Sequence, residues 1–191
     1  MNFKEAYALV KDIQSTTNRT DCEAVFYLAR EIPSGGVIIE TGTGDGRTTA
    51  VIALATMNRD IRIITIDDYS ESKRYGKKRG EWSINCAKKS LNRLGLSNID
   101  FVSGMTSDYL KKYDGKVDMI YLDDCHLYSV VKEEIILSQS LVDNGIIAGH
   151  DYNNWYSEGI AVSKAVDELF DKSKVKITNT VWSTLYCKED K

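Results

Sequence analysis

Features that would point to a membrane, extracellular or nucleic-acid-binding protein are missing from this sequence. No apolar run approaches the roughly 20 residues of a membrane-spanning helix, and the first residues lack the apolar stretch of a signal peptide. The four cysteines, Cys22, Cys86, Cys125 and Cys187, form no C-x-x-C pair, which favours reduced thiols over zinc or disulfides. The net charge of −3 does not favour nucleic acid. These absences predict a cytoplasmic protein with no membrane or nucleic-acid partner.

The apolar residues recur with spacings that predict alternating helices and strands. Strands are expected at 37–40, 61–66, 99–102, 117–122, 146–149, 174–178 and 181–187, and helices at 3–14, 22–31, 48–58, 82–94, 107–112, 129–141 and 160–170. Asp21 is expected to cap the second helix, and Asn144 and Gly145 to form a turn. Unbroken apolar strands fit a parallel sheet buried on both faces. The prediction is one doubly wound α/β domain, with a helical cap at 1–34 and the sheet within 35–187.

One stretch, residues 37–49, combines a short apolar strand, three glycines and the start of a helix. The glycines, Gly42, Gly44 and Gly46, allow positive φ angles and let a ligand approach the backbone closely. The helix start adds unpaired N–H groups and a partial positive charge. We therefore expect a small-molecule site here, at the carboxyl end of a buried strand.

Acidic residues end four of the predicted strands: Glu40, Asp67, Asp123 and Asp151. Because the carboxyl ends of parallel strands share one rim, these acids should lie close together, and a cation or hydrogen-bond donors should offset them. Each acid could instead cap the next helix. Asp67 stands where an acid that binds ribose hydroxyls is expected, which favours an adenosine-type ligand. Glu40, before a G-x-G-x-G turn, suits an ammonium or sulfonium group better than a pyrophosphate.

Four motifs together resemble those of the class I S-adenosylmethionine-dependent methyltransferases. They are E-T-G-T-G-D-G at 40–46, which resembles motif I; Asp67 after the second strand; D-D-C-H-L-Y at 123–128; and Gly145 followed by His150-Asp151. The last two resemble segments of a small-molecule subgroup that includes macrocin and catechol O-methyltransferases. The resemblance covers about residues 35–187. It implies a Rossmann-like seven-stranded sheet in the order 3-2-1-4-5-7-6, with strand 7 antiparallel.

The same resemblance implies S-adenosylmethionine as the cofactor. Glu40 and the glycines would hold its methionine part, Asp67 its ribose, and Met105 with Thr106 would edge its adenine. Many relatives carry an acid at the position of Met105, so Thr106 or Asp108 is the alternative acceptor for the adenine amine. The expected cofactor-binding residues are Glu40, Gly42, Thr43, Gly44, Gly46, Asp67, Asp68, Met105, Thr106 and Asp123.

Some relatives also bind Mg²⁺ through an acid after strand four and an acid followed by Asn or Asp after strand five. Asp123 and Asp151 match two of these ligands, but Tyr152 stands at the third position. Asn153 or Asn154 would have to supply an oxygen. Mg²⁺ is therefore an optional second cofactor in this interpretation.

Methyl transfer to a hydroxyl needs positioning and a base. The two histidines, His126 and His150, each lie near a rim carboxylate, which would orient an imidazole and raise its pKa. We expect His150 or Asp151 to be the base and His126 to be either substrate-facing or structural, with Asp124 a further candidate catalytic residue. The alternative is that both histidines satisfy only loop hydrogen bonds.

The predicted function is methyl transfer to a small-molecule acceptor, at a hydroxyl oxygen, by a monomer or homodimer. A basic segment at 73–79 either closes over the site or is a solvated loop, and Trp155 and Tyr156 either line the acceptor pocket or pack under the last helix. Two alternatives are a catalytically silent cofactor-binding protein and a nicotinamide-dependent oxidoreductase. A nucleic-acid methyltransferase is disfavoured because Pro33 is the only proline, so no Asn/Asp-Pro-Pro-Tyr motif exists.

Overall fold

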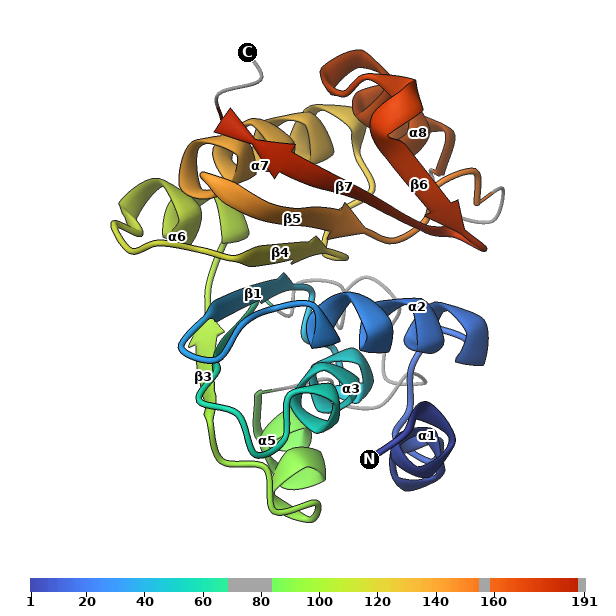
Figure 1. Cartoon of the computed structure of the whole chain (residues 1–191), viewed down its shortest axis with the longest axis vertical. Coiled ribbons are helices and arrows are strands. Elements are labelled where there is room, and N and C mark those ends of the chain that lie inside the picture. Colours follow the sequence, from blue (N-terminus) through green and yellow to red (C-terminus); the bar gives the residue numbers. More distant parts are fainter. Residues whose placement is uncertain (69–83, 155–158, 189–191) are drawn as a thin grey trace.

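A seven-stranded sheet in the order β3-β2-β1-β4-β5-β7-β6 forms the centre of the computed structural model, which describes residues 1–68, 84–154 and 159–188 (Figure 1). The strands are β1 (Val37–Thr41), β2 (Arg62–Asp67), β3 (Ile99–Ser103), β4 (Met119–Leu122), β5 (Asn144–Gly149), β6 (Val175–Thr178) and β7 (Val181–Cys187). Strands β1 to β5 are parallel, and β7 runs antiparallel to both β5 and β6. The predicted Rossmann-like order and the antiparallel seventh strand are confirmed.

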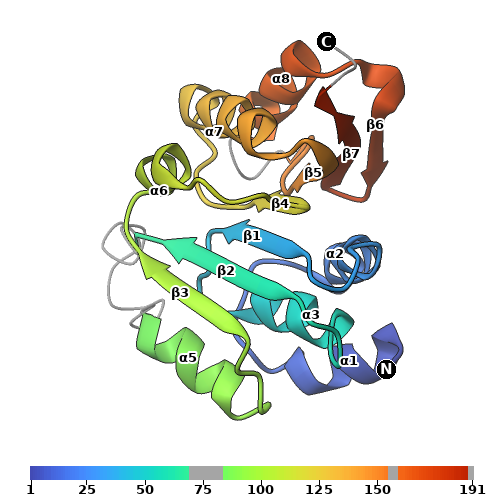
Figure 2. The same ribbon diagram turned by 60° about the vertical axis from the view of Figure 1, so that its left-hand side comes forward.

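Helices cover both faces of the sheet (Figures 1 and 2). They are α1 (Phe3–Val10), α2 (Arg19–Arg30), α3 (Arg47–Ala55), α5 (Ile84–Asn92), α6 (Thr106–Lys112), α7 (Tyr128–Leu141) and α8 (Gly159–Leu169), with a 3₁₀ turn η2 at Lys172–Lys174. Helices α1, α2, α3 and α5 pack on one face, and α6, α7 and α8 pack on the other. Neighbouring strand residues alternate between the two cores: Ile38 contributes to the first and Ile39 to the second.

Three local predictions were wrong. Helix α2 begins at Arg19, three residues before the predicted start, because Asn18 is its N-cap and accepts a hydrogen bond from the Asp21 amide at 3.1 Å. Helix α1 ends at Val10 rather than at residue 14, and the carbonyl of Ile13 accepts a hydrogen bond from Arg47 at 2.8 Å. The expected turn at 144–145 instead begins β5, where Asn144 pairs with Cys187.

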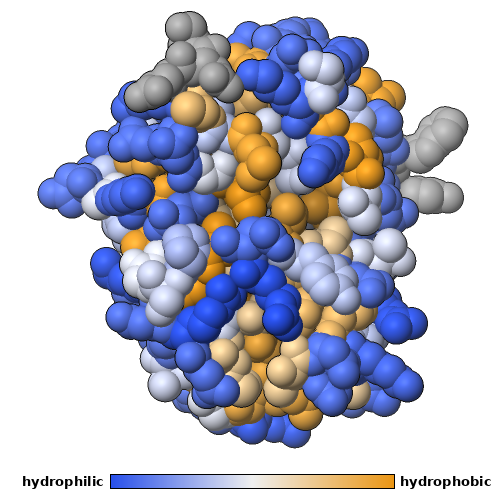
Figure 3. All heavy atoms as spheres, in the orientation of Figure 1, coloured by the Kyte–Doolittle hydropathy of each residue, from blue (hydrophilic) through white to orange (hydrophobic). Residues whose placement is uncertain are grey.

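Polar residues cover much of the surface, and apolar side chains gather in patches between them (Figure 3). Among the described residues, no helix has the length and apolar character needed to cross a bilayer.

Candidate functional site

The parallel strands end at one rim, as the acids at their ends predicted. Thr41 lies opposite both Ile66 and Leu122 in the sheet, and Leu122 lies opposite Gly149. The next residues along the chain are therefore neighbours in space. The rim consists of the glycine turn, Asp67, Asp123, His150 and Asp151.

The glycine turn after β1 lies tightly against the end of β4. Gly42 has a φ angle of +81°, and a Cβ atom there would lie 2.0 Å from the carbonyl oxygen of Asp123. The Gly44 amide donates a hydrogen bond to the Asp67 carboxylate at 2.8 Å. Gly46, with a φ angle of +87°, starts α3. The amides of Gly42 and Gly46 donate to the carbonyls of Ile66 and Thr43, so all three glycine amides hold the turn itself in place beside Asp67.

Glu40 lies beneath this turn rather than on the rim. Its side chain is fully buried, and one carboxylate oxygen accepts hydrogen bonds from the hydroxyls of Thr49 at 2.5 Å and Thr65 at 2.7 Å. The other oxygen has no hydrogen-bond partner in the described part of the chain. Burial raises the pKa of Glu40 to about 8, and these hydrogen bonds only partly offset the loss of water. Its place in the structure favours support of the turn over direct contact with a ligand.

Glu40 should make the folding stability of the protein depend on pH. Between the usual carboxyl pKa and about 8, the folded state keeps a proton that the unfolded state has released. Stability therefore falls as pH rises through this range, by about 1 kcal/mol per pH unit. Urea unfolding of the cofactor-free protein between pH 5.5 and 7.5 should show a shallower slope for Glu40→Gln. Equal slopes in the two proteins would contradict this prediction.

The ends of β2 and β3 form the second part of the rim. The Gly104 amide donates to the Asp67 carbonyl at 3.1 Å, which holds the two strand ends together. Met105 follows and is 53% exposed, so its side chain is available to a flat ring. Thr106 is buried and donates its hydroxyl to Asp124 at 2.8 Å. Asp68 follows Asp67 and is half-buried.

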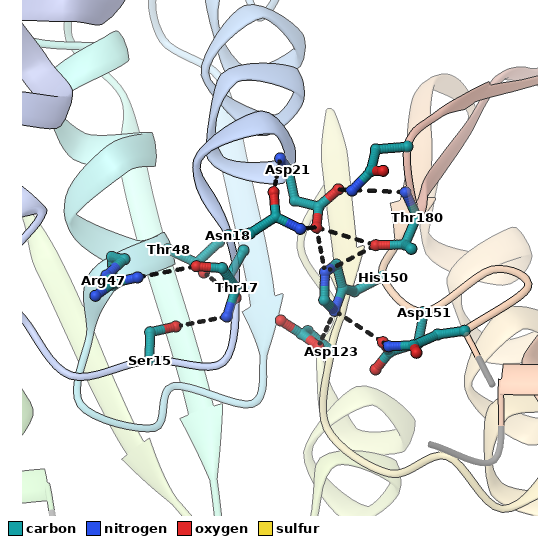
Figure 4. A network of polar contacts seen from close by, with 12 residues as sticks. Ser15, Thr17, Asn18, Asp21, Arg47, Thr48, Asp123, His150, Asp151 and Thr180 are labelled. Atoms are coloured by element: carbon teal, nitrogen blue, oxygen red, sulfur yellow. Dashed lines mark hydrogen bonds and ion pairs between the residues drawn. The ribbon is translucent and has the colours of Figure 1, made fainter. Parts of the chain in front are cut away.

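The end of β5 carries the strongest concentration of charge. The Nε2 atom of His150 lies 3.1 Å from Asp21 and 3.2 Å from the Thr180 hydroxyl, whereas Nδ1 lies 3.4 Å from both Asp123 and Asp151 (Figure 4). Burial disfavours the charged imidazole, but the three carboxylates outweigh it and raise the pKa of His150 above its ordinary value. The three carboxylates therefore favour the charged form of His150, which would offset the acids around it.

The loop after β5 brings the second histidine to the same acids. Asp151 has a φ angle of +61°, which non-glycine residues rarely adopt, and its carboxylate contacts the Nε2 atom of His126 and the amide of Asn154. Burial alone would raise the pKa of Asp151, but the hydrogen bonds from His126 and His150 lower it. Because such strained residues cluster at functional sites, this loop is a candidate for catalysis.

This cluster does not fit Mg²⁺. Asp123, His150 and Asp151 each offer a ligand atom within 4.8 Å of the others. Mg²⁺ prefers near-octahedral oxygen ligands, but the third group here is an imidazole whose two nitrogens both face carboxylates. Of the two predicted amides, Asn154 donates its N–H to Asp151, and the oxygen of Asn153 accepts from a serine of α8. In the described part of the chain, His150 is the group that faces all three acids and can offset their charge.

A small pocket lies beside His126, between the rim and the helices α7 and α8. Its lining consists of Leu122, Asp123, Cys125, His126, Val131, Glu134, His150, Val162 and Trp182. Glu134 is 2% exposed, and burial raises its pKa well above the ordinary value, which favours the neutral carboxyl group. The pocket therefore combines apolar walls with polar groups.

The sequence did not reveal that Asp21 reaches the site. Its only local signal was that of a helix cap, and its partner His150 lies 129 residues away in the chain. The candidates at 73–79, together with Trp155 and Tyr156, lie outside the described residues.

Solved structures with the same fold are numerous. Cofactor-bound Rv0187 from MTB has 15% identity and a TM-score of 0.70, over 95% of this chain and 88% of that one. The O-methyltransferase TomG from Streptomyces achromogenes, in complex with SAM, has 17% identity and a TM-score of 0.66, over 96% and 88%. A putative rRNA-methylase from Clostridium thermocellum has 15% identity and a TM-score of 0.65, over 90% of this chain and 99% of that one. At these identities the likeness shows the fold alone.

No curated protein matches the chain. The sequence model of a methyltransferase domain family matches residues 39–152, more than half of the chain, and spans β1 to the loop after β5. This region contains the glycine turn and all the rim acids described above. The chain therefore belongs to the methyltransferase domain family.

Proposed function

We propose that the protein transfers a methyl group from S-adenosylmethionine to a hydroxyl oxygen of a small molecule. The observation that carries this proposal is the pair of His126 and Asp151, which lies at the same rim as the glycine turn. A carboxylate that holds one nitrogen of an imidazole orients the ring and stabilises its protonated form. This arrangement serves a base beside a cofactor that supplies its own electrophile.

The cofactor would lie along the ends of β1, β2 and β3. Asp67 would accept hydrogen bonds from the ribose hydroxyls, and the glycine turn, whose backbone lets a ligand approach closely, would face the methionine part. Met105 would pack on the adenine, with Thr106 and Asp68 beside it. Asp123 lies between this half of the rim and the histidines, and its charge would favour the sulfonium.

In the reaction, the acceptor oxygen attacks the methyl carbon, a C–O bond forms and the S–CH₃ bond breaks. When bound, S-adenosylmethionine would supply the electrophilic methyl group, and its sulfur would leave with the bonding electron pair as the neutral thioether of S-adenosylhomocysteine. The proton of the hydroxyl passes to His126. We assign this role to His126 rather than to His150, because three carboxylates favour the charged form of His150, which has no lone pair to accept a proton.

Transfer of tritium from methyl-labelled S-adenosylmethionine to an extract of the source cells tests the activity. The label should appear in the fraction of small molecules. Label in RNA would show that the acceptor is RNA rather than a small molecule. If no fraction gains label although the protein binds S-adenosylhomocysteine, the protein is a catalytically silent binding protein.

Replacing Asp67 with asparagine should weaken cofactor binding. Charged hydrogen bonds contribute about 1.5–3 kcal/mol each, so the affinity for S-adenosylhomocysteine should fall by about tenfold to a hundredfold. Titration calorimetry measures this loss. Asp100→Asn is the matched control, because Asp100 lies on β3 and pairs with Arg62 on an exposed surface. If the two variants bind S-adenosylhomocysteine with equal affinity, Asp67 does not bind the ribose.

A further inference from the structure

Asp21 joins three parts of the chain that are distant in sequence. Its carboxylate is completely buried. One oxygen accepts hydrogen bonds from the Asn179 amide at 2.9 Å and the Thr180 backbone at 3.2 Å. The other accepts from Asn18 at 2.6 Å and from the Thr180 hydroxyl at 3.0 Å, and lies 3.1 Å from Nε2 of His150. Helix α2, the β6–β7 turn and the end of β5 therefore meet at this one carboxylate (Figure 4).

From Asp21 a continuous series of contacts leads to the proposed base. His150 bridges Asp21 and Asp151, with Nε2 facing the first acid and Nδ1 lying 3.4 Å from the second. The other oxygen of Asp151 holds His126. Four side chains thus alternate between acid and imidazole across the site, from α2 to the loop between β4 and α7.

The ring of His150 is the central link in this series. It is 7% exposed, and its Nε2 atom faces only Asp21 and Thr180 in the described contacts. A ring held at one nitrogen has a fixed orientation at the other, so Asp21 determines where Nδ1 meets Asp151. A small displacement of the His150 ring would move Asp151 and, through it, His126. The rate of methyl transfer depends strongly on the position of such a group.

We propose that Asp21 is a positioning residue for methyl transfer: acting through His150 and Asp151, it fixes the imidazole of His126 where the acceptor loses its proton. The proposal rests on the proposed role of His126. Its first test needs no acceptor, so a failure of the positioning idea can be told apart from a failure of the proposed function.

A purely structural clamp is the competing explanation, because Asp21 also ties α2 to the β6–β7 turn. The variant Asn179→Gly distinguishes the structural clamp from the positioning role. This change removes one hydrogen bond of the clamp, and glycine suits the φ angle of +56° at that position. The contact between Asp21 and His150 stays in place. A structural clamp would make the two variants alike, whereas positioning would affect only Asp21→Asn.

The first test uses nuclear magnetic resonance of the imidazole nitrogens. The chain contains two histidines, so a ¹⁵N-histidine-labelled sample gives two sets of ring signals, assigned with His126→Gln and His150→Gln. With S-adenosylhomocysteine bound, Asp21→Asn should shift the ring signals of His126 as well as those of His150. Asn179→Gly should leave the His126 signals unchanged. A His126 signal that is the same in wild type and Asp21→Asn overturns the proposal.

The second test measures tritium transfer to the same cell extract. Asp21→Asn should lower the maximal rate about tenfold and leave the KM for S-adenosylmethionine unchanged, whereas Asn179→Gly should keep the wild-type rate. If Asp21→Asn does not bind S-adenosylhomocysteine and so is misfolded, Thr180→Val takes its place, since it removes the hydroxyl that contacts both Asp21 and His150. Wild-type His126 signals in Thr180→Val would then overturn the proposal.

Discussion

Replacement of His126 by glutamine should lower the rate of methyl transfer by about 10²–10³-fold, within the range that a positioned base contributes. Glutamine keeps a polar side chain next to Asp151 but cannot accept the proton of the acceptor. The affinity for S-adenosylhomocysteine should stay at the wild-type value, because His126 lies on the acceptor side of the rim. Initial rates of tritium transfer and titration calorimetry measure the two quantities.

The matched control is Leu127→Ala, a change of a neighbouring side chain that is 48% exposed. It should leave both the rate and the affinity unchanged. If His126→Gln retains more than about a tenth of the wild-type rate, the cofactor and acceptor positions alone account for catalysis. The proton of the acceptor would then leave to solvent, and the pair of His126 and Asp151 would have a different purpose.

Gly42→Ala should cost about 3 kcal/mol of folding stability. The added Cβ would lie 2.0 Å from the carbonyl oxygen and 2.5 Å from the carbonyl carbon of Asp123, both backbone atoms that cannot rotate away. Overpacking costs about 1–3 kcal/mol, and the left-handed backbone at φ +81° adds about 1–2 kcal/mol for a residue with a Cβ. Urea unfolding at constant pH gives the difference in free energy.

Gly44→Ala separates the two costs. Gly44 also has a positive φ angle, +50°, but nothing lies within 4 Å of a Cβ placed there. Its substitution should therefore cost only the backbone strain, about 1 kcal/mol. Equal losses for Gly42 and Gly44 would mean that the end of β4 moves aside at no cost, and that the turn and Asp123 are not tightly coupled.

Much of the fold follows from local pattern. Unbroken apolar runs predicted the parallel strands, because such strands are buried on both faces. The rim was predicted because acids such as Asp67 and Asp123 directly follow those runs. The start of α2 was wrong by three residues because Asn18 and Asp21 are both good capping residues, and sequence alone does not rank them.

The arrangement within the site was much harder to predict. Its chemistry depends on which nitrogen of His150 faces which acid, and its partners Asp21 and Thr180 come from opposite ends of the sequence. Sequence proximity placed His150 beside Asp151 and favoured it as a base. Three surrounding carboxylates, which sequence proximity could not reveal, favour the charged form of the ring and so weigh against that role, which stays a prediction.

The order in which a ribosome makes the chain has a consequence for the His150 cluster. Thr180 follows Asp21 by 159 residues and follows His150 by 30. During synthesis, therefore, all three acids around His150 are made before the Thr180 hydroxyl, which joins them only when the final hairpin leaves the exit tunnel. A nascent chain stalled before that point should bind the nucleoside poorly and digest readily with protease, while release of the last two strands should complete the enzyme in a single step.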